Sequence, residues 1–189
     1  APMGYRREFV ETFDPSAVLT TIRSHLGAAR YAVEDETGFY RYTGAFPDNT
    51  LGLASEQVEF EGLLGMRATR VVVISPDHAV EDFLGVVERM GLHRVSYTVG
   101  WTAWLDIAPD GVNKATAMER VRQILGAPRT GVVAAGDGRN DIEMLEWASV
   151  EGRGFAMGQA PDEVLAVASD RTGSIDQNGL ATALDGLPA

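Results

Sequence analysis

The amino-acid sequence predicts a mixed α/β protein in two parts, an α+β layer unit followed by a unit built on a parallel sheet. Within residues 14–107, a helical pattern followed by two closely spaced β-prone runs occurs twice, which is typical of α+β layers. From residue 114 onward, strands and helices alternate singly, as in βαβ units. Since the pattern changes near Pro109, we expect two domains, at residues 14–108 and 109–189.

The first unit should open with a helix and a hairpin. Asp14 and Pro15 suit a helix cap and the first helical position. Apolar residues then recur at helical spacing until Gly27: Val18, Leu19, Ile22 and Leu26. The β-prone runs 31–34 and 39–43 flank a short polar turn and predict a hairpin.

The rest of this unit repeats the arrangement. Residues 46–66 settle on no single period, so no element is predicted there. A β-branched run at 70–74 predicts a strand, and a helix is expected over 75–91, beginning at its Ser-Pro-Asp sequence. Alternating residues at 95–99 and 102–107 predict a second hairpin.

The second unit should begin with a helix at Lys114 that carries one apolar stripe. That stripe consists of Ala117, Val121, Ile124 and Leu125. A strand at 132–135 and a helix from Asn140 come next. They are followed by a strand near 155–157 and two further helices, at 161–168 and 179–184. This succession predicts a parallel sheet.

The segment from Gly136 to Leu145 joins the predicted strand to the predicted helix and carries two carboxylates. Asp137 lies on the turn, Asp141 lies in the first helical turn, and Asn140 stands at an expected N-cap. Open α/β sheets bind ligands at the carboxyl ends of their strands. Clustered carboxylate and amide oxygens there suit Mg²⁺. The same residues also fit a capped turn whose Asp141 complements the helix dipole, and geometry alone does not separate these interpretations.

Several segments together resemble one known family. Gly-Asp-Gly-Arg-Asn-Asp-Ile-Glu-Met-Leu at 136–145 resembles the fourth motif of haloacid dehalogenase superfamily phosphatases, in the form found in their Cof-like branch. The segments 107–114, 156–160 and 178–180 match that branch in the same order along the chain. The resemblance therefore covers nearly the whole sequence. It implies a cap domain and the carboxyl-terminal half of a Rossmann-like catalytic domain.

The resemblance also implies roles for particular residues. Lys114 would neutralise the phosphoryl group and the nucleophilic carboxylate. By its position alone a solvated lysine at a helix start is the better interpretation, and the resemblance favours the functional role. Asp137 would bind Mg²⁺ directly, and Asp141 would be a second ligand or would act through a water molecule. Asn140 would hydrogen-bond the phosphate or the surroundings of the nucleophile. Arg139 is interpreted as a surface residue, with a phosphate contact as the alternative.

The implied reaction transfers a phosphoryl group from a small phosphorylated metabolite, such as a sugar phosphate, to an aspartate. That aspartate belongs to an Asp-x-Asp motif in the family, and no Asp-x-Asp occurs in this sequence. We therefore expect this chain alone to be inactive. In the resembling fold the strand that bears this aspartate lies beside the strand at 132–135. We therefore expect the strand at 132–135 either to pair with a second copy or with a missing amino-terminal segment, or to leave the second unit less stable than the first. A non-catalytic binding module and a phosphomutase relative remain alternatives.

Composition limits the classes of partner. The 189 residues carry 16 basic and 27 acidic side chains and a net charge of -11, which disfavours nucleic acids and anionic membranes. The sequence contains no cysteine, no apolar run of membrane-spanning length and no signal-peptide pattern, so we expect a cytoplasmic protein.

Overall fold

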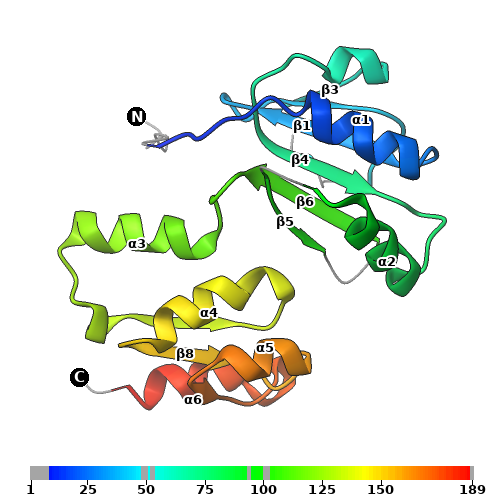
Figure 1. The fold of residues 1–189 in the computed structure, drawn as a ribbon. Helices are drawn as coiled ribbons and strands as arrows, with labels where there is room; N and C mark the ends of the chain where they lie inside the picture. Colours follow the sequence, from blue (N-terminus) through cyan, green and yellow to red (C-terminus); the bar gives the residue numbers. More distant parts are fainter. Residues whose placement is uncertain (1–8, 48–50, 52–53, 93–94, 100–102, 188–189) are drawn as a thin grey trace. The chain divides into compact units, whose positions relative to one another are not determined.

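The computed structural model describes all residues except 1–8, 48–50, 52–53, 93–94, 100–102 and 188–189. The chain divides into two compact units, Ala1–Asp110 and Gly111–Ala189, called unit 1 and unit 2 below. Each combines helices and strands, as the predicted α/β class requires (Figure 1). Within the described part of the chain, no helix has the length and apolar character needed to cross a membrane.

Unit 1 contains a sheet of six described strands in the order β3-β2-β1-β4-β6-β5. The strands are β1 (Arg30–Asp35), β2 (Tyr40–Tyr42), β3 (Ser55–Gln57), β4 (Ala68–Ile74), β5 (Val95–Val99) and β6 (Trp104–Pro109). Both predicted hairpins are present, because β1 pairs antiparallel with β2 and β5 pairs antiparallel with β6. The short strand β3, which lies in a segment without a periodic pattern, adds parallel to β2 at the edge.

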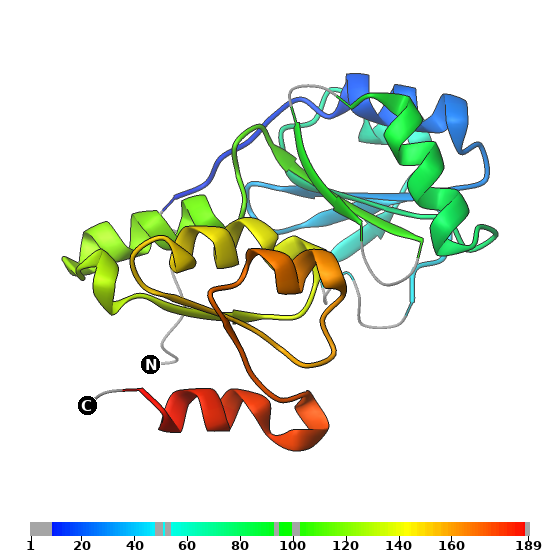
Figure 2. The same ribbon diagram turned by 60° about the horizontal axis from the view of Figure 1, so that its bottom comes forward.

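Two helices, α1 (Ser16–His25) and α2 (Val80–Met90), lie on one face of this sheet (Figures 1 and 2). Their apolar stripes pack on alternate strand residues in one core. Leu19, Ile22 and Phe83 of the helices meet Val71, Val73 and Leu105 of the strands there. The 3₁₀ helix η1 (Phe60–Leu63) joins the same core.

Both helices begin later than the sequence predicts. Pro15, expected at the first helical position of α1, is instead the residue before it. Asp14 nevertheless stabilises this end, because its Oδ1 accepts a hydrogen bond from the Ser16 amide at 2.9 Å. Helix α2 starts at Val80, since residues 76–78 form a turn.

Unit 2 contains a parallel sheet with the described strand order β7-β8-β9. Its strands are β7 (Val133–Gly136), β8 (Arg153–Ala156) and β9 (Asp170–Arg171). Its helices are α3 (Lys114–Leu125), α4 (Ile142–Ser149), α5 (Asp162–Val167) and α6 (Gly179–Asp185), with 3₁₀ helices η2 (Arg129–Gly131), η3 (Arg139–Asp141) and η4 (Ile175–Gln177). Helices α4 and α5 pack against the sheet through Leu145, Ala148 and Val164. The parallel sheet was predicted; the two-residue strand β9 was not.

Helix α3 differs from its expected packing. It begins at Lys114 as predicted, but no residue of it is buried. Val121, Ile124 and Leu125 are 49%, 64% and 73% exposed, so most of the predicted apolar stripe faces outward. Strand β7 likewise has only one described neighbour, β8. The apolar pattern is therefore present without the contacts that such a pattern usually makes.

Candidate functional site

The turn after β7 is organised around the Asp141 side chain. Asp141 Oδ2 accepts hydrogen bonds from the backbone amides of Asp137 and Gly138, at 3.0 and 3.1 Å. Gly136 makes this arrangement possible, because a Cβ atom there would lie 2.5 Å from the Asp141 Cβ. The carboxylate of Asp141 is consequently buried and fixed at the carboxyl end of β7.

Lys114 reaches the same carboxylate from the start of α3. Its Nζ forms an ion pair and hydrogen bond with Asp141 Oδ1. The position of Lys114 follows from the cap that precedes it: Asn113 Oδ1 accepts from the Thr116 amide at 2.9 Å, and Thr116 Oγ1 accepts from the Asn113 amide at 3.1 Å. The two side chains differ in exposure, 46% for Lys114 and 8% for Asp141, so the Lys114 side chain remains partly accessible.

Asp137 lies on the same turn and is partly buried. Its Oδ2 accepts a hydrogen bond from Gln159 Nε2 at 2.7 Å. Gln159 is held in turn, since its Oε1 accepts from the Ile175 amide at 3.1 Å. Gln159 lies within a segment that resembles the family, but the sequence does not identify it as a site residue. A glutamine that follows a strand carries no sequence signal for a contact with a carboxylate 22 positions earlier in the chain.

Asn140 does not have its expected structural role. It was expected to cap the helix, but it lies inside η3, and α4 begins only at Ile142 with Asp141 in the capping position. This difference has a physical cause. The Asp141 side chain accepts hydrogen bonds from the amides of Asp137 and Gly138, and these contacts tighten residues 139–141 into a 3₁₀ turn. The exposed Asn140 places its Oδ1 beside Gly138, where a Cβ would come within 2.7 Å of that oxygen.

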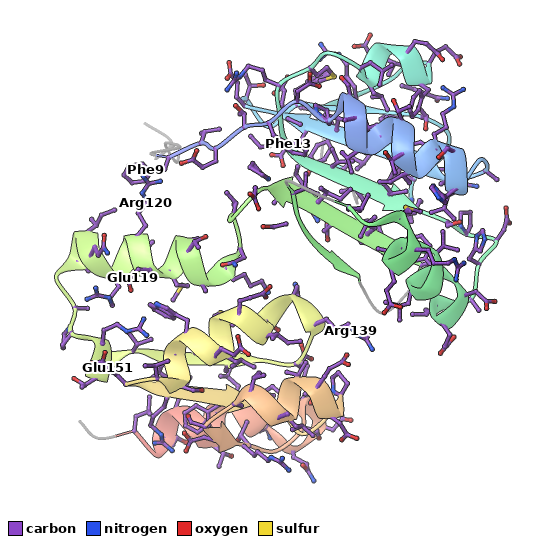
Figure 3. The ribbon with its side chains drawn as sticks, in the orientation of Figure 1. Phe9, Phe13, Glu119, Arg120, Arg139 and Glu151 are labelled. Atoms are coloured by element: carbon purple, nitrogen blue, oxygen red, sulfur yellow. The ribbon has the colours of Figure 1, made fainter. Side chains whose placement is uncertain are left out.

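Arg139, expected to be a surface residue, forms an ion pair with Glu163 of α5. Both side chains are partly exposed, at 31% and 48%. The pair joins η3 to α5 beside the turn, and Figure 3 labels Arg139 at this position. Arg139 therefore has a partner within unit 2 that the sequence did not identify.

A second cluster fixes α3 to α4. Glu119 of α3 accepts hydrogen bonds from Arg122 at 2.7 and 2.9 Å, from Gln123 at 2.8 Å and from the Trp147 indole of α4 at 3.1 Å. These donors, Arg122 first among them, lower the pKa of Glu119 to about 2. Figure 3 labels Glu119 on α3. The cluster holds α3, and with it Lys114, in a defined position on unit 2.

The oxygen atoms around the turn are suitable for Mg²⁺ but do not complete a coordination shell. Within the described residues, no three side chains of the types His, Cys, Asp and Glu converge. Asp141 is already engaged by an ammonium group and two amides, which leaves Asp137 as the more available ligand. Mg²⁺ commonly takes one or two carboxylates and completes its shell with water and substrate phosphate. The donor set fits a cation of that kind.

Comparison with known proteins indicates the same family that the sequence of the turn resembles. Residues 43–184 match the family described as haloacid dehalogenase-like hydrolase. The chain is 31% identical over 121 residues to the 5-amino-6-(5-phospho-D-ribitylamino)uracil phosphatase YitU of Bacillus subtilis. That alignment covers 62% of this chain and 43% of the relative, so the chain spans less than half of the relative's length.

Solved structures show the same fold. SMU.1108c from Streptococcus mutans superposes with a TM-score of 0.76 at 21% identity, over 96% of this chain and 69% of that one. The subclass IIB sugar phosphatase BT4131 superposes with a TM-score of 0.72 at 20% identity, over 90% of this chain and 64% of that one. At these identities the likeness concerns the fold alone. With a match over residues 43–184, the chain belongs to the haloacid dehalogenase-like hydrolase family.

Proposed function

We propose that this chain is part of an Mg²⁺-dependent phosphatase that acts on small phosphorylated metabolites. The observation that carries the proposal is the contact between Lys114 and the buried Asp141, directly beside the partly buried Asp137. A turn that served only to cap a helix would not require a cation from another helix. The alternative of a helix-start lysine surrounded by solvent does not account for this ion pair.

Each residue has a chemical role in this proposal. Asp137 would hold the metal, and Asp141 would orient Lys114 and the backbone of the turn. The half-exposed Lys114 would meet the phosphoryl oxygens, where it offsets the repulsion between an anionic nucleophile and an anionic phosphate. The exposed Asn140 would donate a hydrogen bond to the phosphate. When bound, Mg²⁺ would supply further charge neutralisation at the same oxygens.

The nucleophile of the proposed reaction would come from outside this sequence, which has no Asp-x-Asp motif. Strand β7 supports a nucleophile from another segment, because the outer edge of β7 has no described partner strand. The exposed residues Val121, Ile124 and Leu125 of α3 support it as well. We infer that another segment, from the same protein or from a second copy, pairs with β7 and brings the aspartate to the turn.

The class of substrate is proposed from relatives. YitU is named for a phosphorylated ribityl compound and BT4131 for a sugar phosphate, so a phosphate ester of a sugar or polyol is the favoured class. The absence of cysteine supports a reducing compartment such as the cytoplasm. The net charge of -11 supports a small ligand over a nucleic acid or an anionic membrane.

A non-catalytic binding module is the second candidate, and the missing Asp-x-Asp motif favours it. The reading frame upstream of this sequence discriminates between the two. An in-frame apolar strand that ends in Asp-x-Asp-x-Thr supports the phosphatase, and a frame without it supports the binding module.

Metal and phosphate binding can be tested on the chain itself. Calorimetric titration with Mg²⁺, and then with inorganic phosphate, should show weak saturable binding, because this chain supplies few ligands. Asp137→Asn should remove that binding. Asp170→Asn is the matched control, since Asp170 is a carboxylate of unit 2 that pairs with Arg153 at 2.6 Å, on β9 and not on the turn. Tight Mg²⁺ binding that persists in Asp137→Asn would refute the assigned site.

A further inference from the structure

Gln159 lies in the turn that follows β8, and its side-chain amide has two partners. Its Nε2 donates a hydrogen bond to Asp137 Oδ2 at 2.7 Å, and its Oε1 accepts one from the backbone amide of Ile175 at 3.1 Å. Asp137 belongs to the turn after β7, whereas Ile175 is the first residue of η4. The amide of Gln159 therefore bridges two segments that are far apart in the sequence.

The two partners determine which way the Gln159 amide faces. The Ile175 N–H can only donate, so it requires the carbonyl oxygen of the amide on its side. The NH₂ group must then face Asp137, whose ionised carboxylate can only accept. A glutamate at position 159 could accept from Ile175 but could not donate to Asp137. The contact with Asp137 therefore requires an amide and not only a polar side chain of this length.

Backbone contacts hold the turn that carries Gln159 against both of the segments that its side chain joins. On one side, the Met157 amide donates to the carbonyl of Gly136, the residue before Asp137, at 2.9 Å. On the other side, the Gly158 amide donates to a carbonyl of the segment that leads into η4, at 3.1 Å. Gln159 is thus anchored at its backbone, and its amide spans a gap of fixed width.

This contact restricts the carboxylate that the proposed metal site offers to a cation. Asp137 Oδ2 is engaged by Gln159, and among the described residues Asp137 Oδ1 accepts no hydrogen bond. One oxygen is therefore held while the other stays available. Residues that hydrogen-bond a metal-binding carboxylate orient it, and their loss typically lowers metal affinity by about 10–100-fold.

We propose that Gln159 is a positioning residue of the cation site, which holds Asp137 in the orientation in which its Oδ1 can bind Mg²⁺. Gln159 does not contact the metal in this assignment, because its own oxygen is occupied by the Ile175 amide. The inference rests on the proposed function, since it takes Asp137 as the metal-binding carboxylate. The orientation of Asp137 can nevertheless be measured without a metal.

Gln177 provides a matched control, because it makes one of the same two contacts. Its Oε1 accepts from the Ser174 amide at 3.0 Å, one position before the amide that Gln159 accepts from. Both glutamines are exposed and both satisfy a backbone donor at the start of η4. Within the described residues, no hydrogen bond joins Gln177 to Asp137. Comparison of Gln159→Met with Gln177→Met therefore separates the positioning of Asp137 from support for η4.

The first measurement uses nuclear magnetic resonance on the metal-free full chain. Three-bond couplings between the α and β protons report the χ1 rotamer of Asp137. We expect a single rotamer in the wild type and in Gln177→Met, and averaging over rotamers in Gln159→Met. Averaged couplings in the wild type, or a single rotamer in Gln159→Met, would overturn the proposal.

The second measurement is the affinity for Mg²⁺, followed by the backbone amide signal of Gly138. Gln159→Met should weaken binding by about tenfold or more, and Gln177→Met should leave it unchanged. Equal weakening in both variants would show that Gln159 only supports η4. Unchanged affinity in Gln159→Met, with binding that Asp137→Asn removes, would reject the positioning role alone. Binding that is absent from the wild type, or that persists in Asp137→Asn, would reject the metal site and this inference with it.

Discussion

Lys114 Nζ contacts Asp141 Oδ1, and this contact joins the first residue of α3 to the turn that follows β7. A cation at a helix amino terminus is unfavourable with respect to the helix dipole. The buried carboxylate offsets that cost. Asp141 in turn requires the ammonium and the two amides of its own turn, because a buried carboxylate without partners is strongly disfavoured.

The first prediction concerns the stability of this pair. Lys114→Met should destabilise unit 2 by about 1–2 kcal/mol, less than for a fully buried pair because Lys114 is 46% exposed. Urea titration followed by the nuclear magnetic resonance signals of β8 measures the change. Glu163→Gln, which removes the exposed partner of Arg139, should cost less than about 1 kcal/mol. Equal effects of the two substitutions would show that the Lys114 contact has no special energetic role.

The second prediction concerns Gly136. A methyl group at this position would lie 2.5 Å from the Asp141 Cβ and 2.6 Å from its Cγ, so Gly136→Ala must displace the carboxylate. We expect a loss of about 1–3 kcal/mol, typical of overpacking, together with weaker Mg²⁺ binding. Gly131→Ala is the control, since its nearest neighbour atom would be 3.6 Å away. A stable Gly136→Ala variant with unchanged metal binding would contradict the described turn.

The sequence predicts those parts of the fold that local patterns determine. The two hairpins, the helix that begins at Lys114 and the alternation of strands and helices after it all have local signals, and each of these is present in the described residues. Strand β3 has none, because its exposed residues carry no apolar pattern and it exists only by pairing with β2. The outward-facing stripe of α3 shows another limit, since periodicity identifies an apolar face but not what covers it.

The sequence likewise predicts only part of the candidate site. Asp137 and Asp141 could be chosen from their motif, whereas the Asp137 contact with Gln159 depends on how η4 returns to the turn. The prediction that Asn140 caps the helix is wrong, because the contacts of the Asp141 side chain place Asn140 inside η3 and Asp141 in the capping position. Resemblance identified residue types, and only the fold revealed their contacts.

The third prediction concerns pH. The Glu119 pKa is lowered to about 2 by donors that include Arg122, Gln123 and Trp147. A lowered folded-state pKa means that the ionised carboxylate stabilises the fold above its unfolded value of about 4.5. That contribution is lost as the pH falls toward 2. The stability difference between wild type and Glu119→Gln should therefore be constant above about pH 5 and should shrink below it. A difference that does not depend on pH would exclude this linkage.

The fourth prediction concerns activity. The chain alone should not hydrolyse p-nitrophenyl phosphate or sugar phosphates with Mg²⁺ present, because charge-stabilising groups without a nucleophile do not form a covalent intermediate. Steady-state assays of the purified chain measure this. Magnesium-dependent turnover that disappears in Lys114→Ala would contradict the prediction and would require a carboxylate other than an Asp-x-Asp aspartate to attack the phosphate.

The last prediction concerns the edge of the parallel sheet. The carbonyl groups of Val132 and Gly136 accept from the amides of Arg153 in β8 and of Met157 directly after it. In a parallel ladder the amides of Val133 and Ala135 therefore point away from β8. Strand β4, by contrast, has neighbours on both sides. In a 20.3 kDa monomer, hydrogen exchange at Val133 and Ala135 should therefore be faster than at the amides of residues 71–74.

The oligomeric state decides how this exchange is interpreted. If sedimentation shows a dimer, or if an amino-terminal segment is supplied and binds, the amides of Val133 and Ala135 should become protected as β7 gains a partner strand. Fast exchange at Val133 and Ala135 while residues 71–74 remain protected supports an open edge. Equal protection in a protein that sediments as a monomer would instead show that β7 is covered from within the chain, and the proposed need for a further strand would be wrong.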